Sequence, residues 1–297
     1  MFLGLRVWCG FFTLAILLTG AHQAGAQGKL DARYTIAVAG ISVGQAVWKV
    51  DVGQDRYTIS ANGGASGLLK VLVSGQGEAT AQGLIQNGVP IPASYLSKMT
   101  SDDEASDVKV TFEDRNVKEL VVAAPPAQPD RVPITEAHRK GVMDPLTALV
   151  VPIGGSRDVT NPGEHLSDEV CKQTLPIFDG RRRFDLRLAF KRVDRVKTER
   201  GYQGPVVVCT MTFHPIAGHR PSSTLTKYLA EGRDMELWLA PIAGTYLAAP
   251  YRLTIANMIG AMTISATQWD TVSLAKDRAS IMVGPQGNPT LRRTPGR

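Results

Sequence analysis

Short apolar runs with an alternating pattern recur along residues 31–122, and turn residues separate them. In residues 34–38, apolar side chains alternate with polar or small ones, and Ala39-Gly40 then supplies a turn. Side chains of a strand point alternately to the two faces of a sheet, so this pattern predicts strands joined by hairpins. We therefore expect an all-β fold, a long curved antiparallel meander such as a half-barrel or a β-spiral, with bends at Gly75 and Gly77.

A proline-rich segment divides the strand-rich part of the chain into two halves. Four prolines within residues 125–133 leave no room for a strand or a helix there. The one helix signal follows at Asp144-Pro145, where an acceptor side chain precedes a proline suited to the first helical turn. Whether the strands form one sheet or two is left open. The sequence predicts an all-β domain over residues 27–271, with halves at about 30–124 and 168–271 and one short helix between them, and a disordered tail at 272–297.

The first 26 residues have the pattern of an export signal. Arg6 lies in a short basic start, an apolar run covers residues 7–18, and Ala24-Gly25-Ala26 offers a cleavage site. The run is too short for a permanent bilayer span, and small residues at its exit are typical of a segment that is removed. A lipid-anchored precursor needs its cysteine at the cleavage site, whereas Cys9 lies at the front of the run. We expect a periplasmic protein with a cleaved signal peptide and no lipid anchor.

Removal of the signal leaves two cysteines, Cys171 and Cys209, in a compartment that oxidises thiols. We expect a disulfide between them, because exported thiols tend to be oxidised; the alternative is two buried free thiols. The bridge would close a loop of roughly 40 residues and contribute about 4 kcal/mol as an upper figure. No Cys-x-x-Cys pair is present to lower a thiol pKa, so a redox role is not expected.

Basic residues are concentrated between Lys172 and Arg200. Ten basic side chains stand against four acidic ones there, so this segment alone matches the chain's net charge of +6. Anionic lipid headgroups attract surface lysines and arginines at roughly 1 kcal/mol each, so contact with an anionic membrane surface is one function considered for this hairpin. The alternative is a solvated sheet face on which basic residues protect an edge from aggregation. The candidate contact residues are Arg181, Arg182, Arg183 and Arg187.

Composition and spacing argue against nucleic acid and metal as partners. Aromatic residues make up only 6% of the chain, and an exported protein without a stacking motif is a poor match for nucleic acid. His214 and His219 flank Pro215, which forbids the helix that would place both on one face. Glu164-His165 and Asp185 complete no zinc spacing. We expect no metal and no cofactor.

No set of residues fits a catalytic motif. Nucleophilic hydrolysis needs a serine on a strained turn beside a histidine and an acid. Ser66 misses the Gly-x-Ser-x-Gly form by one place, and Ser74 and Ser156 fit no better. The acids at residues 102–104 are typical of a solvated turn, and no glycine-rich phosphate loop is present. We expect a protein that is not an enzyme.

Three motifs give the chain a likeness to a known family. They are Val38-Ala39-Gly40-Ile41-Ser42-Val43-Gly44, the helix start Asp144-Pro145-Leu146-Thr147-Ala148-Leu149, and the hairpin Asp179-Gly180-Arg181-Arg182-Arg183-Phe184-Asp185-Leu186. Over roughly residues 30 to 270, the chain resembles exported bacterial proteins of the domain-of-unknown-function family numbered thirty-one hundred and eight. The resemblance implies a periplasmic all-β protein with a curved sheet or spiral, like the envelope-integrity and lipoprotein-carrier folds of Gram-negative bacteria. It supplies no catalytic residues.

Three functions follow, in order of preference. The first is a non-enzymatic periplasmic protein whose curved sheet binds lipid, lipoprotein acyl chains or an envelope component on an apolar concave face; a filled interior would rule this out. The second is a structural or interaction module that maintains the cell envelope through protein contacts. The third, an envelope hydrolase, requires two of His165, His214 and His219 to meet a serine or an acid in a pocket.

Overall fold

The structure, a computed structural model, describes residues 26–66, 75–101, 104–123, 130–153, 166–232, 235–255 and 260–274. Residues 1–25 of the predicted export signal, most of the predicted tail and most of the proline-rich linker lie outside the described residues. No helix within the described ranges is long and apolar enough to cross a membrane.

The first half forms the meander that its alternating pattern predicts. In the third strand, buried Tyr57 and Ile59 alternate with exposed Arg56 and Thr58, so one face of the sheet packs and the other meets solvent. Each strand pairs antiparallel with the next one along the chain. These strands are β1 (Gly28–Val38), β2 (Ile41–Val52), β3 (Arg56–Ala65), β4 (Gly75–Gln86), β5 (Val89–Ser101), β6 (Glu104–Glu113) and β7 (Asn116–Val122).

The second half supplies the remaining strands and most of the helical turns. The predicted hairpin turn is present, and Gly180 within it has a φ of 90°, a conformation that glycine adopts without steric cost. The strands are β8 (Val151–Pro152), β9 (Thr174–Phe178), β10 (Arg183–Lys197), β11 (Arg200–Gly201), β12 (Gln203–Ala217), β13 (Glu236–Pro241), β14 (Leu247–Ile255) and β15 (Met262–Ser273). The helical elements are η2 (Glu136–Arg139), α1 (Pro145–Ala148), η4 (Asp168–Cys171) and α2 (Thr224–Ala230).

All of these strands belong to one 15-stranded sheet. Its order is β7-β6-β5-β4-β3-β2-β1-β15-β14-β13-β12-β10-β9, with β11 beside β15 and β8 beside β14. β1 lies between β2 and β15 and pairs antiparallel with both, so the first and last strands meet in the middle of the sheet. The outermost strands, β7 and β9, do not pair with each other, so the sheet is open. The expected all-β fold, a long antiparallel meander, is confirmed, and its strands form a single sheet.

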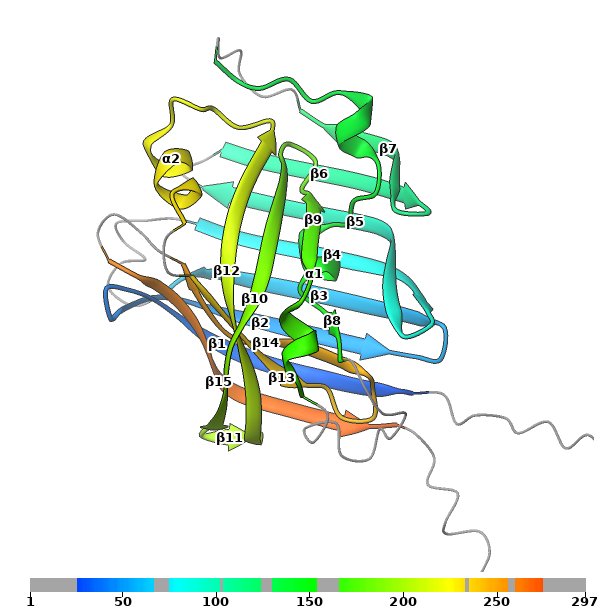
Figure 1. Cartoon of the computed structure of the whole chain (residues 1–297), viewed down its shortest axis with the longest axis vertical. Coiled ribbons are helices and arrows are strands. Elements are labelled where there is room, and N and C mark those ends of the chain that lie inside the picture. The colour runs from blue at the N-terminus through cyan, green and yellow to red at the C-terminus, as the bar shows by residue number, and fades with distance from the viewer. Residues whose placement is uncertain are drawn as a thin grey trace, which may run out of the picture.

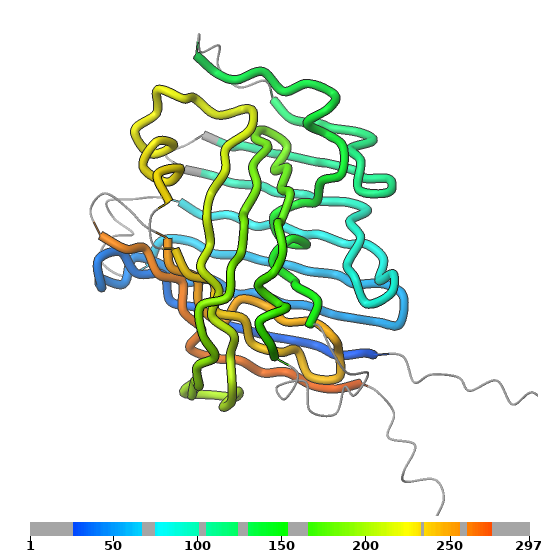
Figure 2. Tube along the Cα trace, in the orientation of Figure 1, coloured from blue at the N-terminus to red at the C-terminus, as the bar shows by residue number. Residues whose placement is uncertain are grey.

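The sheet folds over on itself. β9, β10 and β12 cross in front of β3–β6 in Figure 1, and the trace in Figure 2 follows the same two layers. The layers touch where Arg181, in the turn between β9 and β10, donates to Ser106 Oγ of β6 at 3.1 Å. In the same turn, Gly180 packs against Val108 of β6. The curved sheet therefore encloses an interior between its two layers.

Two clusters of apolar side chains fill this interior. The first lies against β1–β6 and contains Leu30, Val50 and Ile59. The second lies against β9, β10, β12 and β13 and contains Leu188 and Leu237. Burial of apolar surface at about 25 cal/mol per Å² makes these clusters the main source of stability.

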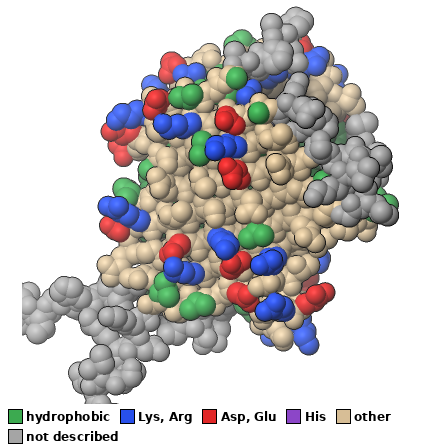
Figure 3. Space-filling view, turned by 180° about the vertical axis from the view of Figure 1, so that it is seen from behind, with side chains coloured by type: hydrophobic (Ala, Val, Ile, Leu, Met, Phe, Trp, Pro, Cys, Tyr) green, Lys and Arg blue, Asp and Glu red, His purple; other side chains and the backbone are tan. Residues whose placement is uncertain are grey.

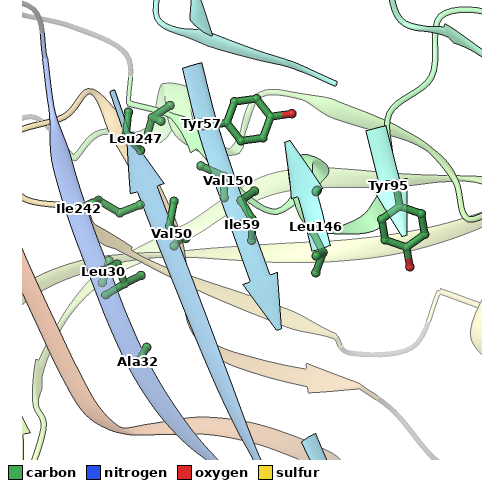
Figure 4. Packing of buried hydrophobic residues seen from close by; sticks show 14 of the residues in the cluster. Leu30, Ala32, Val50, Tyr57, Ile59, Tyr95, Leu146, Val150, Ile242 and Leu247 are labelled. Carbon is green, nitrogen blue, oxygen red and sulfur yellow. The ribbon is translucent and has the colours of Figure 1, made fainter. Parts of the chain in front are cut away.

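Two segments lie between the clusters and contribute to both. Near α1, Leu146 packs in the first cluster while Ala148 packs in the second. In the β13–β14 hairpin, Leu247 belongs to the first cluster and Ala248 to the second. Figure 4 shows Leu146 and Leu247 close to the buried side chains of the first meander, Ile59 among them. The α1 segment and the β13–β14 hairpin thus join the two clusters.

Asp144 caps α1 from a fully buried position. Its Oδ1 accepts hydrogen bonds from the backbone N–H groups of Leu146 at 3.0 Å and Thr147 at 2.9 Å, as the N-cap signal predicts. Its Oδ2 has no hydrogen-bond partner among the described residues. Burial raises the pKa of Asp144 to about 6, because the charged form loses its hydration, while the hydrogen bonds from the helix start oppose this shift.

α1 ends at Ala148, because the chain then extends and Val151 pairs with Ala248 of β14. Two elements differ from the expectation. α2 was not predicted; it buries none of its residues, so its sequence lacks a strong apolar stripe. β15 reaches Ser273, which pairs with Gly28, so the start of the predicted tail at residue 272 was wrong.

We expect Asp144→Asn to remove a pH-dependent loss of stability. The carboxyl of Asp144 has a pKa of about 6 in the folded protein, against an ordinary value of 3.8. The folded state binds the extra proton between these values, so stability falls as the pH rises through this window and stays at the lower level above it. The total change is about 3 kcal/mol as an upper figure. Denaturant unfolding of both proteins across this pH range measures the effect, and identical pH profiles would contradict it.

Candidate functional site

The concave face of the sheet is filled by the chain's own side chains. Leu30 is 2% exposed and Ile59 is fully buried. Val150 and Ile242, from the segments between the clusters, pack in the same cluster as these strand residues. Among the described residues the concave face is therefore covered by packed side chains, and a lipid site on this face stays a prediction. The alternating pattern of a strand indicates which of its faces is apolar, but it does not indicate which part of the chain covers that face.

Cys171 and Cys209 form the predicted pair, with an S–S distance of 1.96 Å and a Cα–Cα distance of 5.5 Å. Cys171 ends η4, Cys209 lies within β12, and both are fully buried in the second cluster. In the sheet, β10 lies between β12 and β9, the strand that follows η4. The bridge therefore spans β10 and fixes η4 over the second cluster.

Three of the four predicted surface arginines are held by neighbouring side chains. Arg182 donates to Asp179 at 3.0 Å, Arg183 to Asp185 at 2.5 Å, and Arg181 to Ser106 at 3.1 Å. Asp179 also accepts from two backbone N–H groups of the turn, so these charges stabilise the hairpin. Arg187 is exposed and makes no ion pair with the described residues. Contact of the four arginines with an anionic surface stays a prediction, and three of them have other partners.

Beyond Arg187, strand β10 has an open edge. β9 pairs with β10 only from Arg183 to Arg187, whereas β10 continues to Lys197. Residues 189–197 therefore have β12 on one side and, within the part of the chain that the structure describes, no strand on the other. We call this stretch the β10 edge. An open edge presents unpaired backbone N–H and C=O groups to a further strand.

The backbone groups of Val193, Arg195 and Lys197 point toward this opening. The N–H of Thr198 donates to the carbonyl of Tyr202 at 3.1 Å, which fixes the hydrogen-bonded positions between β10 and β12 at alternate residues. Residues 193, 195 and 197 fall between those positions. Their N–H and C=O groups therefore face away from β12.

The side chains of the β10 edge are apolar and basic. Phe190 is 44% exposed and Val193 is 51% exposed. Arg195 and Lys197 are exposed and form no ion pair with any described residue. Basic side chains beside an open edge limit uncontrolled strand pairing. The same charges also favour an acidic partner over other partners.

Sequence reasoning missed a cluster next to this edge. The guanidinium carbons of Arg192 and Arg252 lie 5.0 and 4.7 Å from the ring centroid of Trp238, one from β10 and one from β14. Burial alone would raise the pKa of Glu236, but hydrogen bonds from Lys191, Trp238 and Arg192 lower it to about 2. Basic residues of β10 thus have different surroundings. Lys191 and Arg192 pair with Glu236 in this cluster, whereas Arg195 and Lys197 form no ion pair with the described residues. The alternation of Glu236 and Trp238 on one strand face was the only available signal.

The described histidines do not meet in a pocket. His214 lies opposite Asp185 across the β10–β12 pair, but Asp185 accepts from Arg183. His219 has its Nδ1 3.2 Å from the carbonyl of Ala217, and burial lowers its pKa. Among the described residues, no three His, Cys, Asp or Glu side chains are placed to hold a metal ion. His165, Ser74 and Ser156 lie outside the described residues.

Comparison with known proteins identifies a family and no activity. The model of the family described as "Protein of unknown function (DUF3108)" matches residues 33–267. No curated protein matches the chain. A beta-barrel-like protein of domain of unknown function DUF1849 from Brucella abortus aligns with a TM-score of 0.46 at 10% identity, covering 84% of this chain and 99% of its own. A "putative lipoprotein" from Parabacteroides distasonis aligns with a TM-score of 0.28 at 9% identity, covering 82% and 95%.

Replacement of Cys171 and Cys209 by alanine is expected to lower the free energy of unfolding by up to about 4 kcal/mol, because the bridge restricts the unfolded chain. The two residues are 38 positions apart, and both lie in the second cluster. Denaturant unfolding of the wild type with and without reductant, beside the double variant, measures the loss. Thiol labelling of the unfolded, unreduced protein should modify neither cysteine; two labelled cysteines would refute the bridge.

Proposed function

We propose that this chain, which belongs to the DUF3108 family of proteins of unknown function, is a non-catalytic binding protein of the cell envelope. Its partner is a protein with an acidic, extended segment, and this segment lies along the β10 edge. The observation that carries the proposal is the open stretch of β10 at residues 189–197, with its exposed apolar and unpaired basic side chains. This is the interaction module considered from the sequence, with an edge as its contact surface instead of a concave face.

Strand addition is the binding mode that this edge supports. An extended segment that pairs with an open edge gains affinity from backbone hydrogen bonds and specificity from alternate side chains. Val193 and Lys197 would supply backbone donors and acceptors, and Arg195 its carbonyl, because these groups face away from β12. The N–H of Arg195 is already used, since it donates to Asp194 Oδ1 at 2.8 Å. The exposed rings and methyl groups of Phe190 and Val193 would supply apolar contact area on the partner.

Charge favours an acidic segment. Arg195, Lys197 and Arg200 are exposed and have no ion-pair partner among the described residues. Two acidic groups beside Arg195 are already engaged, because Asp194 and Glu236 accept from Arg192 at 3.2 and 3.3 Å, whereas Glu199 next to Arg200 is exposed. Carboxylates of a partner would therefore meet free cations, whereas a basic segment would be repelled.

An envelope location is supported by two observations on the chain itself. Residues 1–26 have the pattern of an export signal. The Cys171–Cys209 pair lies at bonding distance, and disulfides persist in oxidising compartments such as the periplasm.

Photocrosslinking in cells tests the proposal at the β10 edge. A photoreactive phenylalanine analogue in place of Phe190 changes the side chain little and places the probe at the edge. We expect ultraviolet light to join the protein to a defined partner with an acidic segment. Val193→Pro removes an edge-facing N–H without touching the hydrogen bonds to β12, so the adduct should disappear.

Two controls separate strand addition from general contact. Val193→Thr retains the N–H and should keep the adduct, and the same photoreactive residue in place of exposed Leu225 on α2 should not form it. Arg195→Glu with Lys197→Glu should abolish the adduct if charge selects the partner. Equal adducts from positions 190 and 225, or an adduct that survives Val193→Pro, would refute the proposal.

A further inference from the structure

The outer face of β1–β5 carries a trough with a volume of about 890 Å³. It is lined by outward-facing side chains of these five strands, by backbone between them, and by Thr267 of β15. Figure 3 shows this outer face, with the molecule turned by 180° from the view of Figure 1. Blue and red side chains lie next to one another around a broad tan area of uncharged polar groups and backbone. The trough lies on the side of the sheet opposite the filled interior.

One row of uncharged groups runs straight across the trough. The register places Thr35 opposite Gln45, Gln45 opposite Gly64, Gly64 opposite Gln76, and Gln76 opposite Thr100. Its composition is symmetrical, with an amide on each side of the glycine and a hydroxyl outside each amide. Neighbouring strands lie about 4.8 Å apart, so the row is roughly 19 Å long and has a polar group at almost every step.

Gly64 forms the floor between the two amides. A Cβ at this position would meet the carbonyl of Gly75 at 3.0 Å and the Cβ of Gln76 at 3.4 Å, so a side chain here would be tight against β4. Gln45 and Gln76 stand two strand spacings apart, about 10 Å, with an open step between them.

A second row forms one side of the trough. It runs from the Arg33 end through Val47, Asn62 and Glu78 to Lys98. Glu78 and Lys98 pair with each other at 3.6 Å, so the charge at that end is neutralised. The uncharged amide of Asn62 lies at the centre, beside Gly64. The middle of the trough therefore offers three amides and no charge.

Three amide side chains of the trough have no hydrogen-bond partner in the part of the chain that the structure describes. The side chains of Gln45, Asn62 and Gln76 form no hydrogen bond with the described residues, and each is exposed. Elsewhere on the same face, side chains opposite one another are ion-paired, Lys49 with Asp31 at 3.2 Å and Lys29 with Asp51 at 2.6 Å. The amides of the trough thus differ from these ion-paired side chains, because their hydrogen-bonding groups stay available.

We propose that the trough binds a glycan chain that carries N-acetylated sugars and lies across the strands. Side-chain amides and hydroxyls both donate and accept hydrogen bonds, as do the hydroxyl and acetamido groups of such a chain. A linear polymer of rings can present these groups at intervals similar to the strand spacing. Gln45 and Gln76 bind the chain on both sides of the Gly64 floor, and Asn62 binds it from the second row.

The lining excludes the other common ligands. Acyl chains need an apolar surface, whereas Val47 is the apolar side chain that faces outward beside the amides among the described lining residues, since Ala46 packs against the first cluster. Polyphosphate backbones need several free cations, whereas the trough has Arg33 and a Lys98 that is already paired. Peptides add to open edges, whereas all five strands of the trough, β1–β5, are paired on both sides.

Titration of the full mature protein with an N-acetylglucosamine oligosaccharide tests the site. We expect saturable binding, with nuclear magnetic resonance shifts of the side-chain NH₂ groups of Gln45, Asn62 and Gln76. Gln45→Ala with Gln76→Ala should weaken binding about tenfold, because each lost side-chain hydrogen bond contributes modestly and the two act together. Gln82→Ala with Gln86→Ala, two exposed glutamines of β4 outside the trough, is the matched control and should bind like the wild type.

The result is independent of the β10 edge. Val193→Pro should leave glycan binding unchanged, so this site and the proposed protein contact can fail separately. Absence of saturable binding to the wild type would overturn the glycan site. Binding that is unchanged in the Gln45→Ala, Gln76→Ala variant, or shifts confined to other amides, would overturn it as well.

Discussion

β1 and β15 pair along their whole length, from Gly28 opposite Ser273 to Val38 opposite Met262. This contact joins the first and last strands that the structure describes, and it places both of them in the middle of one sheet. The two halves extend from it in opposite directions, so neither can close the interior alone. The sheet must curl for its apolar faces to meet, and the α1 segment and the β13–β14 hairpin then fill the space between them.

The sequence predicts the parts of this arrangement that depend on local patterns. Alternation in residues 34–38, the N-cap at Asp144 and the turn at Gly180 each report on a few neighbouring residues, and each is present in the structure. The sequence does not show whether the concave face is open, because this depends on which segments pack against it. Leu146 and Leu247 come from segments far from β1–β3 in the chain, and no local pattern predicts that contact.

The basic stretch was difficult to interpret for a related reason. The surroundings of its side chains depend on the lengths of two strands. β9 has 5 residues and β10 has 15, so most of β10 lacks a neighbouring strand on one side among the described residues. The sequence suggests a hairpin but does not show where the pairing stops. Its charges then divide by surroundings, since Arg182 and Arg183 stabilise the turn, Arg192 packs on Trp238, and Arg195 stays free. Sequence reasoning missed the trough, because only the register of β2, β3 and β4 places Gln45 and Gln76 in one row, on the two sides of Gly64.

The row of the trough also extends beyond β1. Thr35 lies opposite Ser265, Ser265 opposite Arg252, and Arg252 opposite Trp238, after which the row reaches Arg192 of β10 through Val208. Side-chain contacts join its members, because Arg252 donates to Ser265 at 3.1 Å and packs on Trp238. From β1 to β10 the row crosses five strand spacings, about 24 Å along the sheet. Since hydrogen-bonded strands connect the whole distance, the sheet would hold a glycan in the trough and a protein segment on the β10 edge at a constant separation. A protein whose interior is full can connect two envelope components in this way, because both contacts use surfaces that packing leaves exposed.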